Sequence, residues 1–344
     1  MIRKIQIAKP GRYDALKLVE APDLQVGVEE LIVDVAAAGV NYADAIIRMG
    51  LYASARELHG YPITPGFEIS GTVRAVGTDV RGWQIGERCL GVTLFGGYSS
   101  QIALNAEQAF KVPETLDLIS AAGIPTSFLT AWYCVERLAH VETGEQVLVH
   151  SAAGGVGSAL LQLLKLKGAH VTGVIGASHK AAYVQALGCD ALIDKSIEAL
   201  WPRAQAIAPG GFAHIFDANG VSTLRASFEH LKPMGKLVVY GFHSMLPKTG
   251  GWPNWPKLAW DYLRTPRFSP LALTQANKSV LACNLSFLSA EAPLLRRAML
   301  ELLVQFASGE LKPLAVKTYP LAQADDAHRA IESGNTTGKL VLIP

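Results

Sequence analysis

The sequence predicts an α/β fold, in which a doubly wound parallel sheet is accompanied by a second, β-rich domain. From residue 146 onward, short apolar runs alternate with helical patterns, as expected of repeated βαβ units. Residues 1–122 instead carry short strand-like runs separated by glycine and proline. A chain of 344 residues is also too long for one simple core, so two domains are expected.

The composition excludes several classes of protein. Half of the residues are hydrophobic and the formal net charge is only +2, without a long basic run, so nucleic acid is not an expected partner. No uninterrupted apolar stretch reaches about 18 residues, so a membrane span is not expected, and the start lacks a signal-peptide core. Four scattered cysteines without a CxxC pair fit a reducing compartment, and we expect a cytoplasmic protein.

The chain is organised around residues 146–157, QVLVHSAAGGVG. Residues 147–149 form an apolar run typical of a buried parallel strand, and an apolar-faced helix follows the glycine-rich turn at 151–157. Such a turn directs backbone N–H groups and a helix N-terminus at one point, which suits a pyrophosphate. The pattern is A-x-G-x-x-G, with Ala152 where a dinucleotide-binding fingerprint usually has its first glycine. The sequence therefore predicts a dinucleotide site at this turn.

The other expected elements follow from the same periodicity. In the β-rich part, strands are expected at 31–36, 69–76 and 99–103, and a helical pattern begins near Thr126. Further strands are expected at 170–175, 191–193, 214–217 and 236–240, with helices at 178–187, 197–207 and 222–231. Pro202 is expected to interrupt the second of these helices. A strand at 279–285, a helix at 293–308, and a tail of strand, helix, turn and strand complete the chain.

A segment at residues 243–278 breaks this alternation. It carries Trp252, Trp255 and Trp260 beside several prolines, and it is long for an ordinary connection. It is either a surface excursion that packs its own aromatic residues, or a lid, a subunit contact or a membrane-surface patch.

The end of the second strand of the parallel sheet selects the cofactor. NAD-binding folds usually place Asp or Glu there, to bond the ribose 2′-OH. Residues 174–180 are VIGASHK, without an acid: Gly176 leaves room, and Ser178 and Lys180 can donate to a 2′-phosphate. Lys195, just after the third strand, can add a second cation. We expect NADPH; the alternative is that both lysines are solvated surface charges.

Several motifs occur in a fixed order over nearly the whole chain. They are AGVNYAD at 38–44, RMGLY at 48–52, PGFEISG at 65–71, GWQIGER at 82–88, GGY at 96–98, the turn at 151–157 and GKL at 338–340. This order resembles the medium-chain dehydrogenase/reductase superfamily, and within it the zinc-independent quinone oxidoreductases. The aromatic-rich insertion is most similar to the sub-branch of the synaptic-vesicle amine-transport protein homologues.

The resemblance implies a domain plan. Residues 1–122 and 289–344 would form a GroES-like catalytic domain, and residues 123–288 a Rossmann NADPH-binding domain with its insertion at 243–278. The active site would then lie in the cleft between the two domains. Family members commonly pair through the edge strand of the Rossmann sheet, so a homodimer is expected.

The resemblance also carries an expectation about metals. Where zinc-dependent alcohol dehydrogenases of the superfamily have cysteine and histidine ligands, this chain has Asn41 and Phe67, and the four-cysteine structural lobe is missing. Glu68 alone cannot hold zinc, which needs three or four ligands. We therefore expect no metal, and no alcohol oxidation through a zinc-polarised alkoxide.

By resemblance, the candidate catalytic residues are Asn41 and Tyr52, which would line the nicotinamide and substrate site. Either can donate a hydrogen bond to the substrate oxygen, and Tyr52 could also supply a proton, unless it only packs on the cofactor and solvent supplies the proton. Asn41 could instead be a turn residue that bonds its own backbone. The resemblance adds these cofactor contacts to those above: Thr130, Ala153, Gly154, Gly155, Val156, Asn219, Val239, Tyr240, Gly241, Phe242, Phe287 and Lys339.

Together these patterns favour an NADPH-dependent, zinc-independent reductase that transfers hydride to a quinone or an α,β-unsaturated carbonyl substrate. One alternative is an enoyl-thioester reductase, because related reductase domains share the motifs. The other is a non-catalytic NADPH-binding protein that acts structurally or at a membrane surface.

Overall fold

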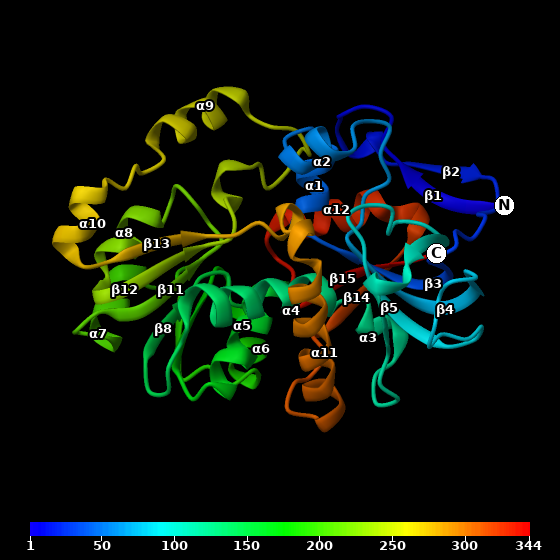
Figure 1. Ribbon diagram of the computed structural model, residues 1–344. Helices are drawn as coiled ribbons and strands as arrows, with labels where there is room; N and C mark the ends of the chain where they lie inside the picture. The colour runs from blue at the N-terminus through cyan, green and yellow to red at the C-terminus, as the bar shows by residue number, and fades with distance from the viewer. The chain divides into compact units, whose positions relative to one another are not determined.

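The computed structural model describes residues 1–344, with the side chain of Ser289 left aside. The chain divides into two compact units (Figure 1). The first unit consists of Met1–Leu129, Lys248–Trp252 and Ser286–Pro344, and the second of Thr130–Pro247 and Pro253–Leu285. Each unit is built on its own sheet, and the predicted α/β class is confirmed.

The second unit contains a six-stranded parallel sheet in the order β10-β9-β8-β11-β12-β13. Its strands are β8 (Gln146–Val149), β9 (His170–Ile175), β10 (Ala191–Asp194), β11 (Phe212–Asp217), β12 (Leu231–Val239) and β13 (Ser279–Ala282). β8 and β11 lie at the centre, and all their residues except the half-buried Gln146 are buried. The strand order reverses between β8 and β11, and sheets of this kind bind ligands outside the carboxyl ends of the strands at such a reversal.

Helices connect these strands. They are α5 (Gly155–Leu166), α6 (Ala181–Ala186), α7 (Leu200–Ile207) and α8 (Leu224–Glu229). The expected interruption at Pro202 is wrong, because α7 begins only at Leu200 and Pro202 lies in its first turn. An N–H group there has no partner within the helix, so its loss costs little. Before β8, α4 (Pro125–Trp132) continues into a π-helical segment, Tyr133–Ala139.

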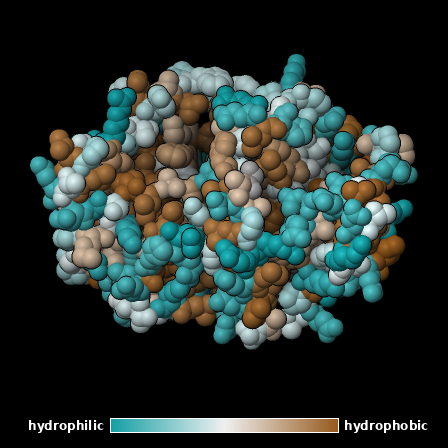
Figure 2. Space-filling model, viewed as in Figure 1, coloured by the Kyte–Doolittle hydropathy of each residue, from teal (hydrophilic) through white to brown (hydrophobic). Residues whose placement is uncertain are grey.

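The aromatic-rich segment forms two helices, α9 (Trp255–Arg264) and α10 (Pro270–Ala276), drawn in yellow in Figure 1. Trp260 and Tyr262 on α9 are 59% and 73% exposed, whereas Phe268 packs on Phe228 with ring centroids 5.1 Å apart. On the face shown in Figure 2, hydrophobic residues are interspersed with hydrophilic ones. In the first unit, Arg48 Nη1 donates to the carbonyl of Gly251 at 3.0 Å and so holds residues 248–252.

The first unit contains a mixed sheet in the order β14-β15-β3-β4-β5-β7, with β6 also paired to β3, and a separate β1-β2 pair. The bounds are β1 (Ile2–Gln6), β2 (Lys17–Ala21), β3 (Glu30–Val40), β4 (Glu68–Val76), β5 (Arg88–Val92), β6 (Gln101–Asn105), β7 (Ala109–Lys111), β14 (Val316–Pro320) and β15 (Lys339–Ile343). β15 runs antiparallel to β3, with Leu340 opposite Val40. The C-terminal tail therefore completes a sheet that the N-terminal residues begin.

Five helices accompany this sheet: α1 (Tyr42–Arg48), α2 (Ala53–Leu58), α3 (Leu118–Ala121), α11 (Ala292–Ser308) and α12 (Ala324–Ser333). The amphipathic pattern expected at 293–308 is α11, whose buried residues include Met299, Leu302 and Phe306. Among the described residues, no helix combines the length and apolar character that crossing a membrane requires.

Candidate active site

The turn after β8 has a backbone conformation and a close packing that few other residues could adopt. Ser151 adopts a left-handed backbone with φ of 54°, and a Cβ atom on Gly157 would lie only 2.3 Å from the Ser151 carbonyl oxygen. The glycine therefore lets α5 approach the strand end closely. Ala152, which stands where the fingerprint has glycine, is buried, and its N–H donates to the Val174 carbonyl at 3.0 Å. The N–H groups of residues 155–157, at the start of α5, have no acceptors within the helix and suit an anion.

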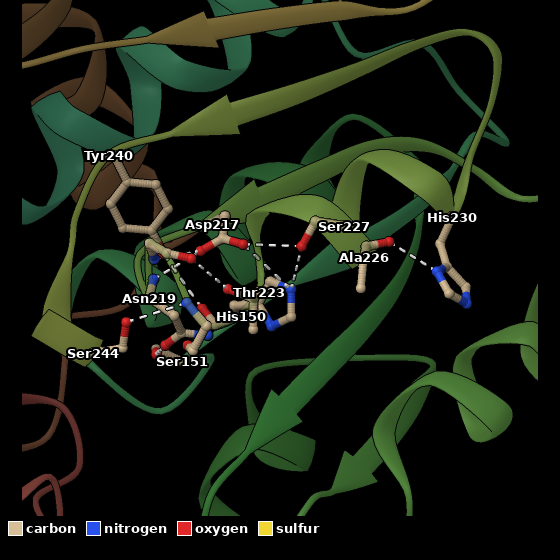
Figure 3. Close-up of polar contacts among 12 residues, drawn as sticks. His150, Ser151, Asp217, Asn219, Thr223, Ala226, Ser227, His230, Tyr240 and Ser244 are labelled. Atoms are coloured by element: carbon tan, nitrogen blue, oxygen red, sulfur yellow. Dashed lines mark hydrogen bonds and ion pairs between the residues drawn. The ribbon is translucent and has the colours of Figure 1, made fainter. Parts of the chain in front are cut away.

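A buried polar network lies beside this turn at the carboxyl ends of β8 and β11 (Figure 3). Asp217 Oδ1 accepts the N–H groups of Asn219 and Gly220 at 2.8 and 3.1 Å, and its Oδ2 accepts the Ser227 hydroxyl at 2.9 Å. His150 Nε2 lies 3.1 Å from Ser227 Oγ. Burial lowers the pKa of His150 below its usual value, so the ring is neutral at pH 7.

The same hydrogen-bond network connects several of the expected cofactor-binding residues at this end of the sheet. Ser151 Oγ donates to Asn219 Oδ1 at 3.0 Å, which joins the turn to the loop after β11. Tyr240, just past β12, donates its hydroxyl to the His150 carbonyl at 3.4 Å. A Cβ atom on Gly220 would lie 2.6 Å from the Phe242 ring, so the two loops pack closely. The structure thus brings Asn219, Tyr240 and Phe242 to one end of the sheet, where Val239 ends β12 and Gly241 follows.

The residues expected at a 2′-phosphate lie after β9 and β10. Gly176 follows β9, and a Cβ atom there would lie 3.3 Å from Lys195 Cε, so the two positions adjoin. Lys180 is buried in spite of its charge. Ser178 Oγ donates to Asp194 Oδ2 at 2.5 Å. Asp194, at the end of β10, also accepts the Ser196 hydroxyl and N–H, and these hydrogen bonds hold the pKa of Asp194 below its usual value.

Asp194 was not among the predicted site residues, because an acid was expected only at the end of the second strand of the parallel sheet. Its carboxylate is bonded by Ser178 Oγ and by the N–H and hydroxyl of Ser196, three donors in all. The acid at the end of this third strand was visible in the sequence, and parallel strands place their carboxyl ends at one edge.

The remaining candidates belong to different units. Ala153, Gly154 and Val156 lie in the turn and the first turn of α5 of the second unit, and Thr130 lies on α4 at the start of that unit. Phe287, Asn41, Tyr52 and Lys339 belong to the first unit, where the Phe287 side chain is 46% exposed.

A buried polar centre in the first unit is formed by Asn41, Glu68 and Lys339. Lys339 Nζ lies 2.5 Å from Glu68 Oε1 and donates to Asn41 Oδ1 at 2.5 Å, while Asn41 Nδ2 donates to Glu68 Oε1 at 2.8 Å. Glu68 Oε2 accepts the N–H of Thr126 at 2.7 Å. Both charged side chains are almost completely buried. Buried charges are tolerated when they are paired and hydrogen-bonded in this way.

Asp44 is hydrogen-bonded to the same polar centre through Asn41. Its Oδ2 accepts the Asn41 N–H at 2.8 Å and the Tyr98 hydroxyl at 3.0 Å, and its Oδ1 accepts the Gly66 N–H at 3.0 Å. Burial is the dominant effect on this carboxyl group and raises the pKa of Asp44 to about 7. Asp44 was not among the predicted site residues, although an Asn followed three residues later by Asp is a recognisable helix start. Asn41 is indeed the residue that precedes α1.

Tyr52 lies at the start of α2, in an aromatic cluster. Its ring meets Phe67 edge to face, with centroids 5.8 Å apart, and its hydroxyl oxygen lies 2.8 Å from Ser286 Oγ. The ring is therefore fixed by packing, and the hydroxyl has a polar neighbour in Ser286.

The donor set around Glu68 does not fit zinc. An ammonium group cannot ligate a metal. The Lys339 ammonium is instead paired with the Glu68 carboxylate, which would otherwise be available as a ligand. Over the residues that the structure describes, no three His, Cys, Asp or Glu side chains are grouped as a metal site would require.

Comparisons with known proteins give the family. Residues 27–114 match the alcohol dehydrogenase GroES-like domain, and residues 187–342 match a family described as zinc-binding dehydrogenase. The synaptic vesicle membrane protein VAT-1 homolog of Danio rerio is 33% identical over 344 residues, covering 99% of this chain and 69% of the relative. The quinone oxidoreductase of Escherichia coli, solved in complex with NADPH, is 28% identical with a TM-score of 0.86, and the match covers 100% of both chains. The chain belongs to the zinc-independent quinone oxidoreductase branch of the medium-chain dehydrogenase/reductase superfamily, which includes the VAT-1 homologues.

Membership of this branch confirms the predicted resemblance and the GroES-like part of the fold. A third similar protein, CurK enoyl reductase, is 26% identical with a TM-score of 0.84 over 99% of both chains. The family that matches residues 187–342 is described as zinc-binding, but the residues around Glu68 do not form a zinc site. Lys339 supplies the positive charge beside Glu68 instead.

Proposed function

We propose that the protein is an NADPH-dependent, zinc-independent reductase that transfers hydride to a quinone or an α,β-unsaturated carbonyl compound. One observation carries this proposal: the turn after β8 presents the N-terminus of α5 at the strand-order reversal, with Asn219 joined to it through Ser151. The similar Escherichia coli quinone oxidoreductase, described as complexed with NADPH, supports the same cofactor here.

The residues present fit this dinucleotide. The backbone N–H groups of Gly155 and Val156 would bind the pyrophosphate, while Ala153 and Gly154 shape the turn, in which the Gly154 N–H donates to the Ser151 carbonyl at 3.0 Å. Gly176, Ser178, Lys180 and Lys195 would receive the 2′-phosphate, since their loops adjoin and carry two cations. Asp194 adjoins these loops as a carboxylate whose pKa is held low by Ser178 and Ser196, so the two lysines would have to balance its charge as well as that of the phosphate. Bound NADPH supplies the hydride.

The polar residues of the first unit would supply the remaining chemistry. Hydride addition to a conjugated carbonyl places negative charge on its oxygen, and fixed donors stabilise that charge. The Asn41 amide carries a second N–H beyond the one given to Glu68, and the Tyr52 hydroxyl can donate as well. The Lys339 ammonium adds a fixed positive charge beside Asn41. We assign Asn41 and Tyr52 as the donors and Lys339 as the residue that holds the Asn41 amide.

The direct test is NADPH oxidation by the purified protein with a panel of quinones and enones, beside NADH under the same conditions. We expect turnover with NADPH and weaker or no turnover with NADH. Absence of oxidation above background with every acceptor, in a protein that binds NADPH, would favour a non-catalytic role. Tighter binding of NADH would overturn the cofactor assignment.

A second candidate is an enoyl-thioester reductase, which the similarity to CurK enoyl reductase favours. An α,β-unsaturated thioester presents the same conjugated carbonyl to the same donors. A short enoyl thioester in the acceptor panel separates the two candidates, because a quinone reductase should prefer the quinone by kcat/KM.

A homodimer, a cytoplasmic location and a membrane-surface contact also remain proposals. Size-exclusion chromatography with light scattering measures the first. For the last, flotation with lipid vesicles would compare the full chain with a variant in which the exposed Trp260 and Tyr262 are replaced by serine. Equal flotation of the two proteins would argue against a membrane contact through α9.

A further inference from the structure

Two of the four cysteines lie side by side in the second unit. Cys134 Sγ and Cys283 Sγ are 3.4 Å apart, although 149 positions separate the residues in sequence. Cys134 is buried and Cys283 is partly exposed. Cys89, by contrast, lies in the core of the first unit, and Cys189 follows α6. We propose that Cys134 and Cys283 are an oxidisable dithiol, a modification site at which a peroxide produces an intramolecular disulfide.

The elements that carry the two thiols can accommodate this bond. Cys134 belongs to the π-helical segment Tyr133–Ala139, and Cys283 directly follows β13, where its N–H donates to the Val239 carbonyl at 3.1 Å. A π-helical stretch has a less regular hydrogen-bond pattern than an α-helix and is common at functional sites. Bond formation requires the two sulfur atoms to approach by roughly 1.4 Å, to the usual S–S length of about 2.05 Å.

The two thiols differ in a way that sets the order of the steps. The hydrogen bond between them lowers the pKa of Cys283 and raises that of Cys134, and burial raises the Cys134 pKa further. Cys283 is also the more exposed thiol, so it meets the oxidant first. Its thiolate attacks a peroxide oxygen, the O–O bond breaks, and Cys283 sulfenic acid and hydroxide form. The Cys134 sulfur then attacks the Cys283 sulfur, water leaves, and the disulfide results.

The dithiol adjoins residues assigned to the nucleotide. Both thiols lie close enough to Tyr240 to raise its pKa, in addition to the larger effect of burial. Cys134 lies four residues after Thr130, in the π-helical segment that continues the helix of Thr130. The disulfide would therefore shift the helix of Thr130 relative to the end of β12. We expect it to weaken NADPH binding several-fold, an expectation that rests on the proposed function.

The modification itself is tested without nucleotide. The reduced full-length protein is treated with hydrogen peroxide and digested without reductant, and peptides are identified by mass. We expect a linked Cys134–Cys283 peptide pair, a mass decrease of two hydrogen atoms in the intact protein, and reversal by dithiothreitol. Cys134→Ser and Cys283→Ser should each abolish the link, whereas the control Cys189→Ser should retain it. Oxidation of Cys283 only to sulfinic acid, or links that involve Cys189 instead, would overturn the proposal.

The coupling to nucleotide is measured next, by titration of NADPH into reduced, oxidised and re-reduced protein. Weaker binding that dithiothreitol restores supports the coupling, and equal affinity of the three forms overturns it. Failure of the reduced protein to bind NADPH would contradict the proposed function and leave the disulfide result unaffected.

Discussion

Lys339 Nζ lies 2.5 Å from Glu68 Oε1, and neither side chain is more than 2% exposed. The pair joins β15, from the C-terminal tail, to the start of β4 in the N-terminal part of the chain. Asn41 bonds to both partners and links them to the start of α1. A fixed cation therefore stands next to the glutamate, and the amide of Asn41 is oriented by charges on either side.

We expect the Lys339–Glu68 ion pair to stabilise the folded protein. We expect Lys339→Met to lower the free energy of unfolding by about 3–5 kcal/mol, because it leaves the Glu68 carboxylate buried without its cation. Lys339→Met combined with Glu68→Gln should recover much of this loss, since no unpaired charge remains. Denaturant unfolding of the two single variants and the double variant measures the coupling. Strict additivity of the single effects would show that the pair is not coupled.

Asp44 should give the protein a pH-dependent stability. Burial raises its pKa to about 7 in the folded state, whereas an unfolded Asp titrates near 4. Between these values the folded state binds one proton more than the unfolded state, so this residue's contribution is greatest at acidic pH and is lost as the pH rises through about 7. The slope is at most about 1.4 kcal/mol per pH unit.

Asp44→Asn removes this titration. We expect the difference in unfolding free energy between wild type and variant to change with pH from 5 to 7 and to be constant above 8. Urea unfolding at each pH supplies the comparison. A difference that does not vary with pH would mean that Asp44 is ionised in the folded protein.

The sequence predicted the parts of the site that depend on local pattern. The strands at 170–175 and 191–193, and the turn at 151–157, follow from apolar runs and glycine spacing, and β9 begins and ends where expected. The partners of Lys339 could not be predicted in this way, because β15 meets β3 only after the whole second unit has intervened. The contact between Cys134 and Cys283 is hidden for the same reason. Periodicity identifies elements, but it does not say which distant strand lies beside them.

Lys180 and Lys195, on the loops after β9 and β10, should determine cofactor choice. Charge-assisted hydrogen bonds are worth about 1.5–3 kcal/mol each, so Lys180→Ala and Lys195→Ala should each weaken NADPH binding by about 10- to 100-fold. Binding of NADH, which lacks the 2′-phosphate, should change little. Isothermal titration with both nucleotides measures the ratio, and Lys17→Ala, at an exposed position on β2, is the control. Equal losses for NADH and NADPH would refute the phosphate assignment.

The turn offers a matched pair of glycine variants. A Cβ atom on Gly157 would lie 2.3 Å from the Ser151 carbonyl oxygen, whereas one on Gly210 would have no atom within 4 Å. Gly157→Ala should therefore destabilise the protein by about 1–3 kcal/mol, as overpacked sites do, and weaken NADPH binding by displacing α5. Gly210→Ala should be neutral or slightly stabilising. Thermal unfolding with and without NADPH records both effects, and similar behaviour of the two variants would contradict the close approach.

Tyr52→Phe separates a chemical role of this residue from a packing role. The variant keeps the ring against Phe67 and removes only the hydroxyl that lies 2.8 Å from Ser286 Oγ. Loss of one donor to a developing oxyanion typically costs about 10²- to 10³-fold in kcat, and the remaining Asn41 donor should place the effect near the lower end of that range. NADPH affinity should be unchanged.

Ser286→Ala is the control for Tyr52→Phe, because it removes the partner of the hydroxyl and leaves the hydroxyl itself. Ser286→Ala should reduce kcat less than Tyr52→Phe does, since the Tyr52 hydroxyl can still donate to the substrate. Steady-state kinetics with a quinone, together with direct nucleotide titration, distinguish the cases. Full activity of Tyr52→Phe would assign Tyr52 to packing alone and leave Asn41 as the donor.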